Sequence, residues 1–383
     1  MRGYIKKRAK GSYTIVVPLG RDTATGKYKQ HWEAVKGNKA DAARRLAEVQ
    51  TDLFSGSFIK PDKTTVAEYL LDWLENTARF QVSPRTYEGY EMIIKKHLIP
   101  GIGDRYLSDL TGSVIQKYYA KKLKEPRNAK QGPTPLSAHS VRCHHRVLHR
   151  ALKSAVIKRL ISHNVADDTE PPIPVKKEFK SMTVAQLKLF IEELEGSPYY
   201  ELLYTSLFTG LRRSEILALR WQDIDLQNGY LTVCRVLHRI KGKFIFWDTK
   251  TEKSKATISL TPSTVTLLEN YKQRRAGEYL LMGKELSDAD LAFCRVDGTP
   301  ILPNCITEYW RRFADRIGMP DIRLHDARHT HATLMIKQGV NIKVVQERLR
   351  HTRIETTLGI YSHVLPGMQE EAAKIFDDEF APK

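Results

Sequence analysis

The sequence predicts a multidomain protein that is mainly α-helical and contains small β-sheets. Its 383 residues are enough for two or three domains with their own cores. The hydrophobic pattern changes along the chain: it is β-like before residue 60, helical over 64–165 and mixed after 181. Prolines and charges without periodicity fill Val165–Lys180, which is typical of a linker. We therefore expect domains at 1–60, 64–165 and 181–383, with a linker at 166–180.

The first domain is predicted to be a small β-sheet closed by a helix. The β-branched and aromatic segment Ser12–Pro18 favours one strand. A second strand is expected over Lys27–Val35, half-buried through the alternate residues Tyr28, Gln30, Trp32 and Ala34. Asn38 is a preferred N-cap residue, and the apolar spacing after it predicts a helix over Lys39–Phe54.

The second domain is predicted to be all-helical. Helix starts are indicated at Thr64 or Thr65 and at Ser83-Pro84. Further helices are expected over Gly112–Leu123 and from Ser137 or Ala138 to Leu160. The apolar residues of this last helix point inward, and its other faces carry Arg142, His144, His145, Arg146, His149, Arg150 and Lys153. His145 and His149 share a face, but the neighbouring arginines oppose a dication, so phosphate contact is the preferred interpretation over metal.

The third domain is predicted to mix helices with a few strands. Helices are expected over Thr183–Leu194, Tyr199–Thr209, Thr261–Arg275 and Pro303–Gly318, from His325 to about Gln338, and from Asn341 and after His351. Strands are expected over Tyr230–Ile240, Phe244–Asp248 and Ala256–Leu260. Residues 277–300 are predicted to be a loop with short strand pieces, and Met368–Phe376 a short helix.

Composition limits the class of function. No apolar run is long enough for a membrane span or a signal peptide, so we expect a cytoplasmic protein without a membrane partner. The four cysteines form no CxxC pair, which favours a reducing compartment.

The net charge of +18 indicates a polyanionic partner. Residues 1–60 hold 13 Lys and Arg against 5 Asp and Glu, and residues 61–180 hold 21 against 13. Residues 181–383 are nearly balanced, with 28 against 26. The surplus therefore lies in the first half, and nucleic acid is the better candidate partner than a membrane surface. In the first domain the expected phosphate contacts are Lys6, Lys7, Arg8, Lys10, Arg21, Lys27 and Lys29; the alternative is a solvated basic terminus.

The candidate chemistry lies between Leu324 and Tyr361. His325 and Arg328 share one face at a helix N-terminus, where the amides and the dipole favour an anion. Arg212 is expected on a turn between two apolar helices, an unusual place for arginine unless an anion is near. Lys250 lies in a basic hairpin loop, which by itself is a weak signal.

These residues can form a metal-free phosphoryl-transfer site. Such a site needs cations for the phosphate oxygens, a nucleophile, and an acid for the leaving oxygen. Arg212, Arg328, His325 and His351 can supply the cations and donors, and Lys250 the acid. Tyr361 can be the nucleophile, because clustered positive charge helps a phenol to ionise.

Four segments together resemble the sequence boxes of the tyrosine recombinases, in particular the integrases of phages and conjugative transposons. They are TGLRRSE (209–215), TKTEKSK (249–255), HDARHTHAT (325–333) and LRHTRIETTLGIYSH (349–363). The chain departs from the family's pattern at Arg350, where glycine is common, at Gly359, where an acidic residue is common, and at Val165, where proline is common. None of these positions is a catalytic residue.

The resemblance implies a site-specific recombinase that cuts and rejoins DNA without cofactor, metal or ATP. Arg212 and Arg328 would clamp the phosphate, Lys250 would protonate the leaving 5′ oxygen, and Tyr361 would form a 3′-phosphotyrosyl bond. His325 and His351 would assist proton transfer, and Glu215 would support the site. The three domains would be an arm-binding module with a three-stranded sheet, a core-binding domain and a mixed α+β catalytic domain. The expected partners are double-stranded DNA with arm and core sites, three further copies in a homotetramer, and an accessory DNA-bending or directionality protein.

Three alternatives remain at the level of sequence. A metal hydrolase would use the HxxxH pair of His325 and His329, although no glutamate follows the first histidine. A DNA-binding regulator would use a helix-turn-helix over Val340–Ser362, but it leaves Arg212 and Lys250 unexplained. A topoisomerase of the IB type would share the chemistry and lack the exchange of partners.

Overall fold

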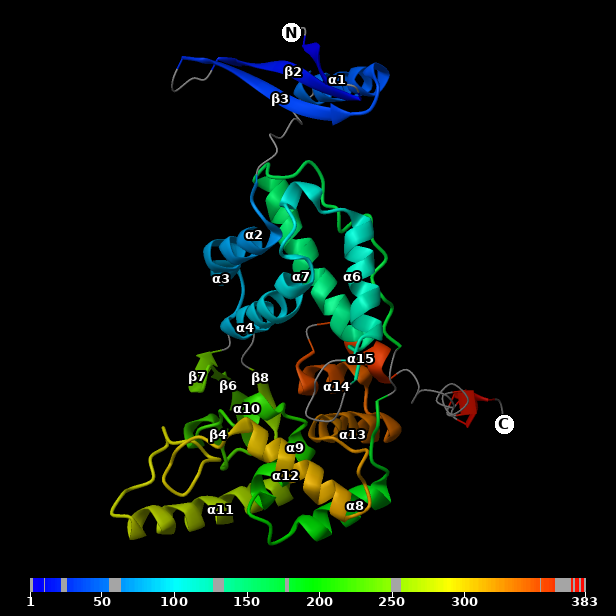
Figure 1. Cartoon of the computed structure of the whole chain (residues 1–383). Coiled ribbons are helices and arrows are strands. Elements are labelled where there is room, and N and C mark those ends of the chain that lie inside the picture. Colours follow the sequence, from blue (N-terminus) through cyan, green and yellow to red (C-terminus); the bar gives the residue numbers. More distant parts are fainter. Residues whose placement is uncertain are drawn as a thin grey trace. The chain divides into compact units, whose positions relative to one another are not determined.

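The computed structural model describes residues 3–9, 11–21, 26–54, 63–126, 134–175, 179–248, 256–351, 353–361, 373–374, 376–378 and 380–381. They form two compact units, Met1–Lys176 and Lys177–Lys383 (Figure 1), which are described separately below. Among the described residues, no helix is both long and apolar enough to cross a lipid bilayer. The predicted helix Met368–Phe376 lies mostly outside the described residues.

The N-terminal module is a three-stranded antiparallel sheet with a helix on one face. Strands β1 (Tyr4–Ala9), β2 (Ser12–Arg21) and β3 (Tyr28–Lys36) pair in the order β1-β2-β3. Helix α1 (Lys39–Phe54) is confirmed at the predicted bounds. Asn38 caps it, because Asn38 Oδ1 accepts from the backbone N–H of Asp41 at 2.9 Å.

The prediction that Tyr28, Gln30, Trp32 and Ala34 form the half-buried face of β3 is wrong. Trp32 is 50% exposed and Tyr28 is 71% exposed. The pairing register places His31 opposite Val17 and Glu33 opposite Ile15, and both apolar partners pack against α1. Glu33 is tolerated on the helix side because Arg45 of α1 donates to it at 2.8 Å. The ion pair therefore allows a charged residue on the covered side of the sheet, beside the apolar contacts of Ile15 and Val17 with α1.

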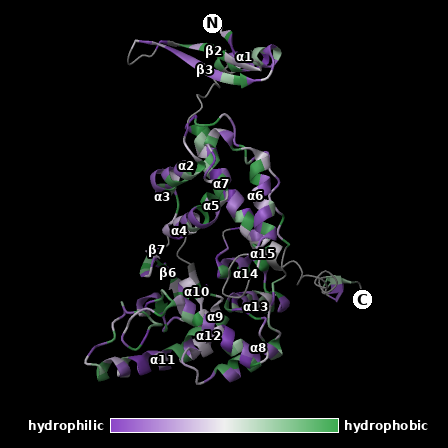
Figure 2. Cartoon of the chain, viewed as in Figure 1, coloured by the Kyte–Doolittle hydropathy of each residue, from purple (hydrophilic) through white to green (hydrophobic). Residues whose placement is uncertain are grey.

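The helical part of the first unit is built from short helices around one core. They are α2 (Val66–Trp73), a π-helical turn at Leu74–Ala78, α3 (Arg79–Gln81), α4 (Pro84–Ile93), a second π-helical turn at Ile94–Leu98, α5 (Ile99–Ile102), a 3₁₀ turn at Leu107–Asp109, α6 (Gly112–Lys124) and α7 (Ala138–Ile157). Thr65, Ser83 and Ser137 cap α2, α4 and α7 with their hydroxyls, as predicted. The mixed colouring of α7 in Figure 2 reflects one apolar face and several basic ones.

The sequence predicted His144 on an outer face of α7, but the structure places it in the core. It is 3% exposed, its Nδ1 is 2.9 Å from the Tyr118 hydroxyl, and its ring stacks on His97 with centroids 4.6 Å apart. Burial, followed by the charges of His97 and Lys122, lowers the pKa of His144 to about 4. A neutral histidine can fill this core position because a tyrosine hydroxyl satisfies its ring nitrogen.

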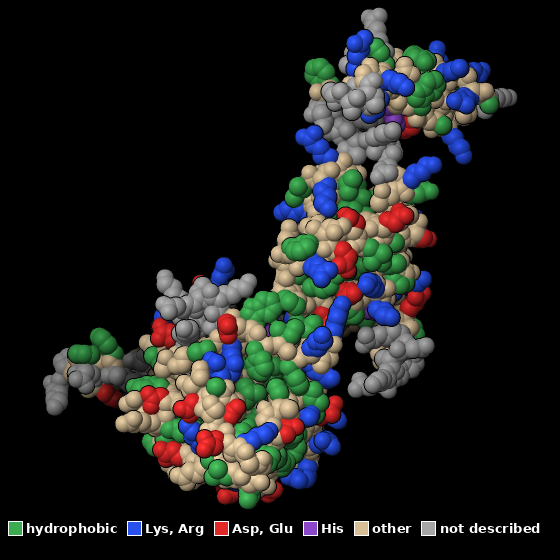
Figure 3. Space-filling model, turned by 90° about the vertical axis from the view of Figure 1, so that its left-hand side faces the viewer, with side chains coloured by type: hydrophobic (Ala, Val, Ile, Leu, Met, Phe, Trp, Pro, Cys, Tyr) green, Lys and Arg blue, Asp and Glu red, His purple; other side chains and the backbone are tan. Residues whose placement is uncertain are grey.

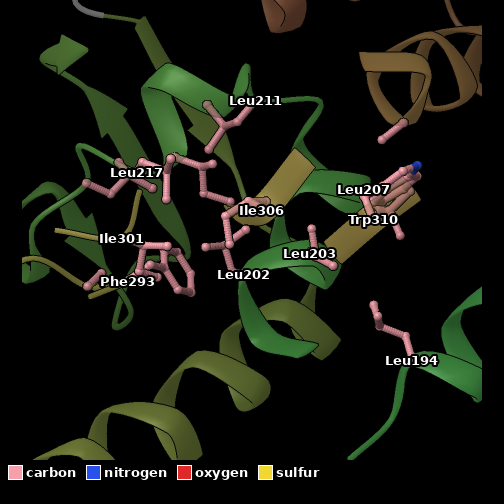
Figure 4. Packing of buried hydrophobic residues seen from close by; sticks show 14 of the residues in the cluster. Leu194, Leu202, Leu203, Leu207, Leu211, Leu217, Phe293, Ile301, Ile306 and Trp310 are labelled. Atoms are coloured by element: carbon pink, nitrogen blue, oxygen red, sulfur yellow. The ribbon is translucent and has the colours of Figure 1, made fainter. Parts of the chain in front are cut away.

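The second unit surrounds a large apolar core with helices and two small sheets. The helices are α8 (Val184–Leu194), α9 (Tyr200–Thr209), α10 (Arg213–Ile216), α11 (Pro262–Leu281), α12 (Pro303–Arg316), α13 (Leu324–Lys337), α14 (Ile342–Leu349) and α15 (Ile354–Tyr361), with a 3₁₀ turn at Trp221–Asp223. Figure 4 shows Leu202 and Leu203 of α9 close to Ile306 of α12 within this core. The helices predicted from apolar spacing are confirmed.

Two predictions for this unit are wrong in their boundaries. The strand expected over Tyr230–Ile240 is two strands, β5 (Tyr230–Val233) and β6 (Arg235–Ile240). Strand β5 pairs with β4 (Ile224–Asp225) and β8 (Ala256–Ser259), whereas β6 pairs, among the described strands, only with β7 (Lys243–Asp248). The chain changes sheets at Cys234, where the next residue, Arg235, donates to the carbonyl of Ala218 at 2.9 Å.

Helix α11 continues past the predicted end at Arg275 to Leu281. Arg275 is 4% exposed and is anchored by tertiary contacts, because it donates to Glu278 and, at 2.9 Å, to the carbonyl of Arg295. These contacts hold the helix through Gly277, a residue that normally weakens a helix.

Candidate active site

Arg212 and Glu215 are held together in the turn between α9 and α10. Helix α9 ends because Gly210 has φ 66° and ψ 19°, a left-handed conformation that glycine adopts without steric cost. The backbone N–H of Arg212 donates to Glu215 Oε2 at 2.7 Å, and Arg212 Nη1 donates to Oε1 at 2.9 Å. The Glu215 side chain is 7% exposed and that of Arg212 is 39% exposed. A buried carboxylate therefore orients a guanidinium that still reaches the surface.

Arg328 connects helix α13 to the C-terminal ends of α9 and α14. It is 3% exposed on α13, and its Nη1 donates to the carbonyl of Gly210 at 2.7 Å. Its Nη2 donates to the carbonyl of Leu349, the last residue of α14. Arg328 thus satisfies carbonyls at the C-terminal ends of α9 and α14, which lie just before Arg212 and His351 in the chain. A small residue is needed at position 210, because a Cβ would lie 3.0 Å from His331 and from Leu349.

His325 lies at the exposed start of α13, one turn before Arg328. Asp326 caps this helix, since its Oδ2 accepts from the backbone N–H of Arg323 at 2.8 Å. The His325 ring meets the ring of buried His329 edge-on, with centroids 4.9 Å apart. Among the described side chains, no group of three or more His, Cys, Asp or Glu is arranged to hold a metal ion.

His351 links the end of α14 to the helix that ends at Tyr361. Its Nδ1 lies 2.8 Å from the hydroxyl of Thr357, and its carbonyl accepts from Gln346 at 2.6 Å. Thr357 is fully buried on α15 and is four residues before Tyr361, so the two positions share a helix face. The side chain of Tyr361 and all of Lys250 lie outside the described residues.

The arginines and histidines of the site lie close enough for the arginine charges to shift the pKa values of the histidines. Partial burial, then the charges of Arg328 and Arg212, and then those of His325 and Arg350 lower the pKa of His351 to about 4. The pKa of His325 is also lowered, first by desolvation and next by Arg328. Burial raises the pKa of Glu215, but Arg350 and Arg212 outweigh it, so the net shift is downward. The site is therefore a group of arginine cations with neutral histidine donors, which is suited to bind and polarise an anion.

The sequence prediction did not include Arg350 in this cluster. Arg350 follows α14 with φ 54° and ψ 46°, and its Nη2 forms an ion pair with Glu215 Oε2. The departure from glycine at this position was visible in the sequence, but its partner Glu215 lies far upstream. Spacing along one helix cannot reveal such a contact.

Most of the predicted DNA-binding residues have exposed side chains. Lys6, Lys7 and Arg8 are exposed on β1, Lys27 and Lys29 are exposed at β3, and Arg142 is exposed on α7. Two other arginines of α7 have intramolecular contacts. Arg146 donates to Cys143 Sγ at 3.1 Å, and Arg150 donates to the Tyr90 hydroxyl at 3.2 Å. Lys10 lies outside the described residues.

Comparison with known proteins settles the family. Residues 180–367 match the phage integrase family, and residues 65–123 match the phage integrase N-terminal SAM-like domain. The chain belongs to the phage integrase family of tyrosine recombinases. It is thus a site-specific recombinase that breaks and rejoins DNA strands, and neither the topoisomerase nor the regulator alternative is favoured.

Relatives of this tyrosine recombinase match along nearly the whole chain. It is 27% identical over 376 residues to the ICEBs1 integrase of Bacillus subtilis, and the matched region covers 98% of this chain and 99% of that protein. It is 26% identical over 396 residues to a XerC-like tyrosine recombinase of Caldanaerobacter subterraneus subsp. tengcongensis, and the matched region covers 98% of each protein.

Solved structures confirm the predicted fold class. The Tn1549 transposon integrase, solved in complex with transposon right end DNA, superposes with a TM-score of 0.67 at 20% identity, covering 83% of this chain and 100% of that one. A lambda integrase dimer bound to a core site superposes with a TM-score of 0.57 at 20% identity, covering 93% and 94%.

Proposed function

We propose that this tyrosine recombinase integrates and excises a mobile DNA element by cutting each strand through a 3′-phosphotyrosyl intermediate. The observation that carries the proposal is the convergence of Arg212, Arg328, His325 and His351 from three separate chain segments. His351 contacts the helix that ends at Tyr361 through Thr357. A nucleophile on that helix would therefore act beside the cations.

In the proposed cleavage step, the phenol oxygen of Tyr361 attacks the scissile phosphorus and the bond from phosphorus to the 5′ oxygen breaks. Arg212 and Arg328 stabilise the charge on the phosphate oxygens, and Lys250 gives a proton to the departing 5′ oxygen. His325 and His351 assist the transfer of the phenol proton and donate to the phosphate. The reverse attack by the 5′ hydroxyl of another strand rejoins the DNA. No bond energy is lost, so the reaction is expected to need no ATP, and it is expected to proceed in the presence of a chelator.

The proposed substrate is double-stranded DNA with core and arm sites, bound by a homotetramer. Among the structural neighbours, one lambda integrase is a tetramer bound to a Holliday junction, and the Tn1549 integrase was solved with transposon DNA. We assign residues 1–60 to arm sites, 64–165 to core sites, 166–180 to a linker and 181–383 to catalysis. The basic surplus in the first 180 residues supports this division. In Figure 3 the charged side chains visible on the N-terminal module are mainly Lys and Arg, whereas the visible face of the C-terminal unit mixes both charges.

Three further assignments belong to the same proposal. The segment after Tyr361, most of which lies outside the described residues, is expected to contact a neighbouring protomer. An accessory protein bends the DNA or sets the direction, and the reaction takes place in the bacterial cytoplasm at the nucleoid. The relatives from Bacillus and Caldanaerobacter support a bacterial setting.

The substitution Arg212→Ala tests the phosphate-binding role. It should leave DNA affinity within about threefold of wild type, because most binding energy comes from contacts outside the scissile phosphate, and it should slow strand cleavage at least about a hundredfold. Gel shift and single-turnover cleavage measure the two effects. Arg213→Ala is the matched control, since Arg213 donates to the carbonyl of Pro303 on α12 at 3.1 Å. Loss of DNA binding without loss of chemistry in Arg212→Ala would contradict the assignment.

A further inference from the structure

Arg350 combines two features that are each unfavourable for an arginine. Its φ of 54° lies in the left-handed region, which costs a residue with a Cβ about 1–2 kcal/mol relative to the right-handed helix. Its side chain is only 11% exposed, so its charge is largely removed from water. Glycine would meet the backbone requirement at this position without either penalty. A functional interaction of the guanidinium would account for the arginine.

The interaction that the structure offers is with Glu215. Arg350 Nη2 pairs with Glu215 Oε2, while Arg212 Nη1 donates to Oε1 at 2.9 Å. The Glu215 carboxylate is thus shared by the guanidiniums of Arg212 and Arg350, which are far apart in the sequence. Neither Nη1 nor Nη2 of Arg350 makes a hydrogen bond among the described residues, so its contact with Glu215 is an ion pair.

The sharing changes the charge that Arg212 presents. An isolated Arg212–Glu215 pair is neutral, and its carboxylate competes with a phosphate for the arginine. With Arg350 the three groups carry a net charge of +1, and the carboxylate is held by two partners. Arg212 therefore keeps its orientation while its attraction for an anion is less completely cancelled.

We propose that Arg350 is a positioning residue for strand cleavage, which acts on Arg212 through Glu215. This inference rests on the proposed function, because cleavage is the reaction affected. Exposure argues against a direct role: the Arg212 side chain is 39% exposed and can meet DNA, whereas those of Arg350 and Glu215 are 11% and 7% exposed.

The test compares Arg350→Gly, Glu215→Gln and the double variant with wild type. Glycine suits the left-handed backbone, so Arg350→Gly should fold, and Arg350→Lys provides a second variant that keeps the charge. Lys241→Gly is the matched control, since Lys241 is an exposed residue with φ 47° in the turn between β6 and β7. Arg350→Gly should slow single-turnover cleavage about tenfold to a hundredfold with unchanged DNA affinity, a size expected for a misplaced catalytic group. Lys241→Gly should cleave at the wild-type rate.

The double variant distinguishes action through Glu215 from independent action. If Arg350 acts through Glu215, adding Arg350→Gly to Glu215→Gln should slow cleavage no further. If the two effects multiply, Arg350 acts independently and the proposal is overturned. Cleavage by Arg350→Gly at the wild-type rate would also overturn it.

The pH dependence gives a readout that a purely structural role would not change. The charges that face Glu215 are Arg350 and Arg212, and both favour its ionised form. Removing Arg350 should raise the pKa of Glu215, so that Glu215 is protonated sooner as the pH is lowered. Cleavage by Arg350→Gly should therefore begin to decline, on acidification, at a higher pH than cleavage by wild type. His325 and His351 titrate in the same site, but their contribution cancels when the comparison is repeated in Glu215→Gln, where the shift should vanish. An unshifted profile in Arg350→Gly would contradict the proposal. If wild type itself forms no covalent adduct, the proposed function has failed instead.

Discussion

The contact between His351 and Thr357 is the described link between the cation cluster and the helix of the proposed nucleophile. Because the Thr357 hydroxyl lies 2.8 Å from His351 Nδ1, it fixes the orientation of the imidazole ring. The other ring nitrogen is then presented in a defined direction.

Replacing this hydroxyl should weaken catalysis more than folding. Thr357→Val keeps the shape of the buried side chain and removes a hydrogen bond of about 1 kcal/mol, so cleavage should slow about fivefold to tenfold. Thr357→Ser, which keeps the hydroxyl, should cleave nearly as fast as wild type. Single-turnover assays on a core-site duplex measure both rates. Equal rates for Val and Ser would show that the hydroxyl does not orient His351.

At the level of residues, the sequence identified the cationic side chains that the structure brings together, but not the contacts that hold them. Arg212, His325, Arg328 and His351 could be found because each residue type suits a phosphate site and their segments match a family pattern. Arg350 could not be assigned a partner, since its contact with Glu215 spans more than a hundred residues. The roles of Lys250 and Tyr361 remain predictions, because no described contact involves their side chains.

Helix α13 carries histidines whose protonation opposes folding. Arg348 Nε donates to His331 Nε2 at 2.9 Å, which requires that nitrogen to be unprotonated. Burial and the charge of Arg348 lower the pKa of His331 to about 3, and burial followed by the charge of His325 lowers that of His329 to about 4. Both rings are therefore neutral at pH 7 in the folded protein.

The C-terminal unit should lose stability in mild acid. Between the unfolded pKa of about 6.5 and the folded value, only the unfolded chain binds the proton, so each such histidine lowers the free energy of unfolding by up to about 1.4 kcal/mol per pH unit as pH falls. His331→Gln keeps an acceptor for Arg348 and cannot titrate. Urea unfolding followed by tryptophan fluorescence from pH 7 to pH 5 should show a shallower loss for this variant. The same slope in both proteins would contradict a neutral His331.

At the level of elements, helices were predicted more reliably than sheets. The caps and apolar spacing of α1, α2 and α4 are local signals and were sufficient. The covered face of β3 and the change of sheet at Cys234 depend on cross-strand register and on ion pairs, which are not visible in local periodicity. Helix α11 was predicted too short for the same reason, since the tertiary contacts of Arg275 stabilise its end.

At the level of the whole molecule, charge and chemistry are divided between regions. The first 180 residues carry most of the net charge of +18, and the last 203 carry the cation cluster on a nearly balanced surface. We therefore propose that the first region supplies most of the DNA binding and the second carries the chemistry. The composition alone suggests this division, because an excess of Lys and Arg that is confined to one half has no structural requirement.

The most direct test of the account is whether Tyr361 becomes covalently attached to DNA. The substrate is a duplex that carries the joined ends of the element and a nick just beyond the cleavage position, so that the released 5′ hydroxyl fragment diffuses away. Wild-type protein should accumulate as an adduct that survives denaturing detergent, and Tyr361→Phe should bind the duplex with the same affinity and form no adduct. An adduct that persists in Tyr361→Phe would place the nucleophile elsewhere and contradict the account.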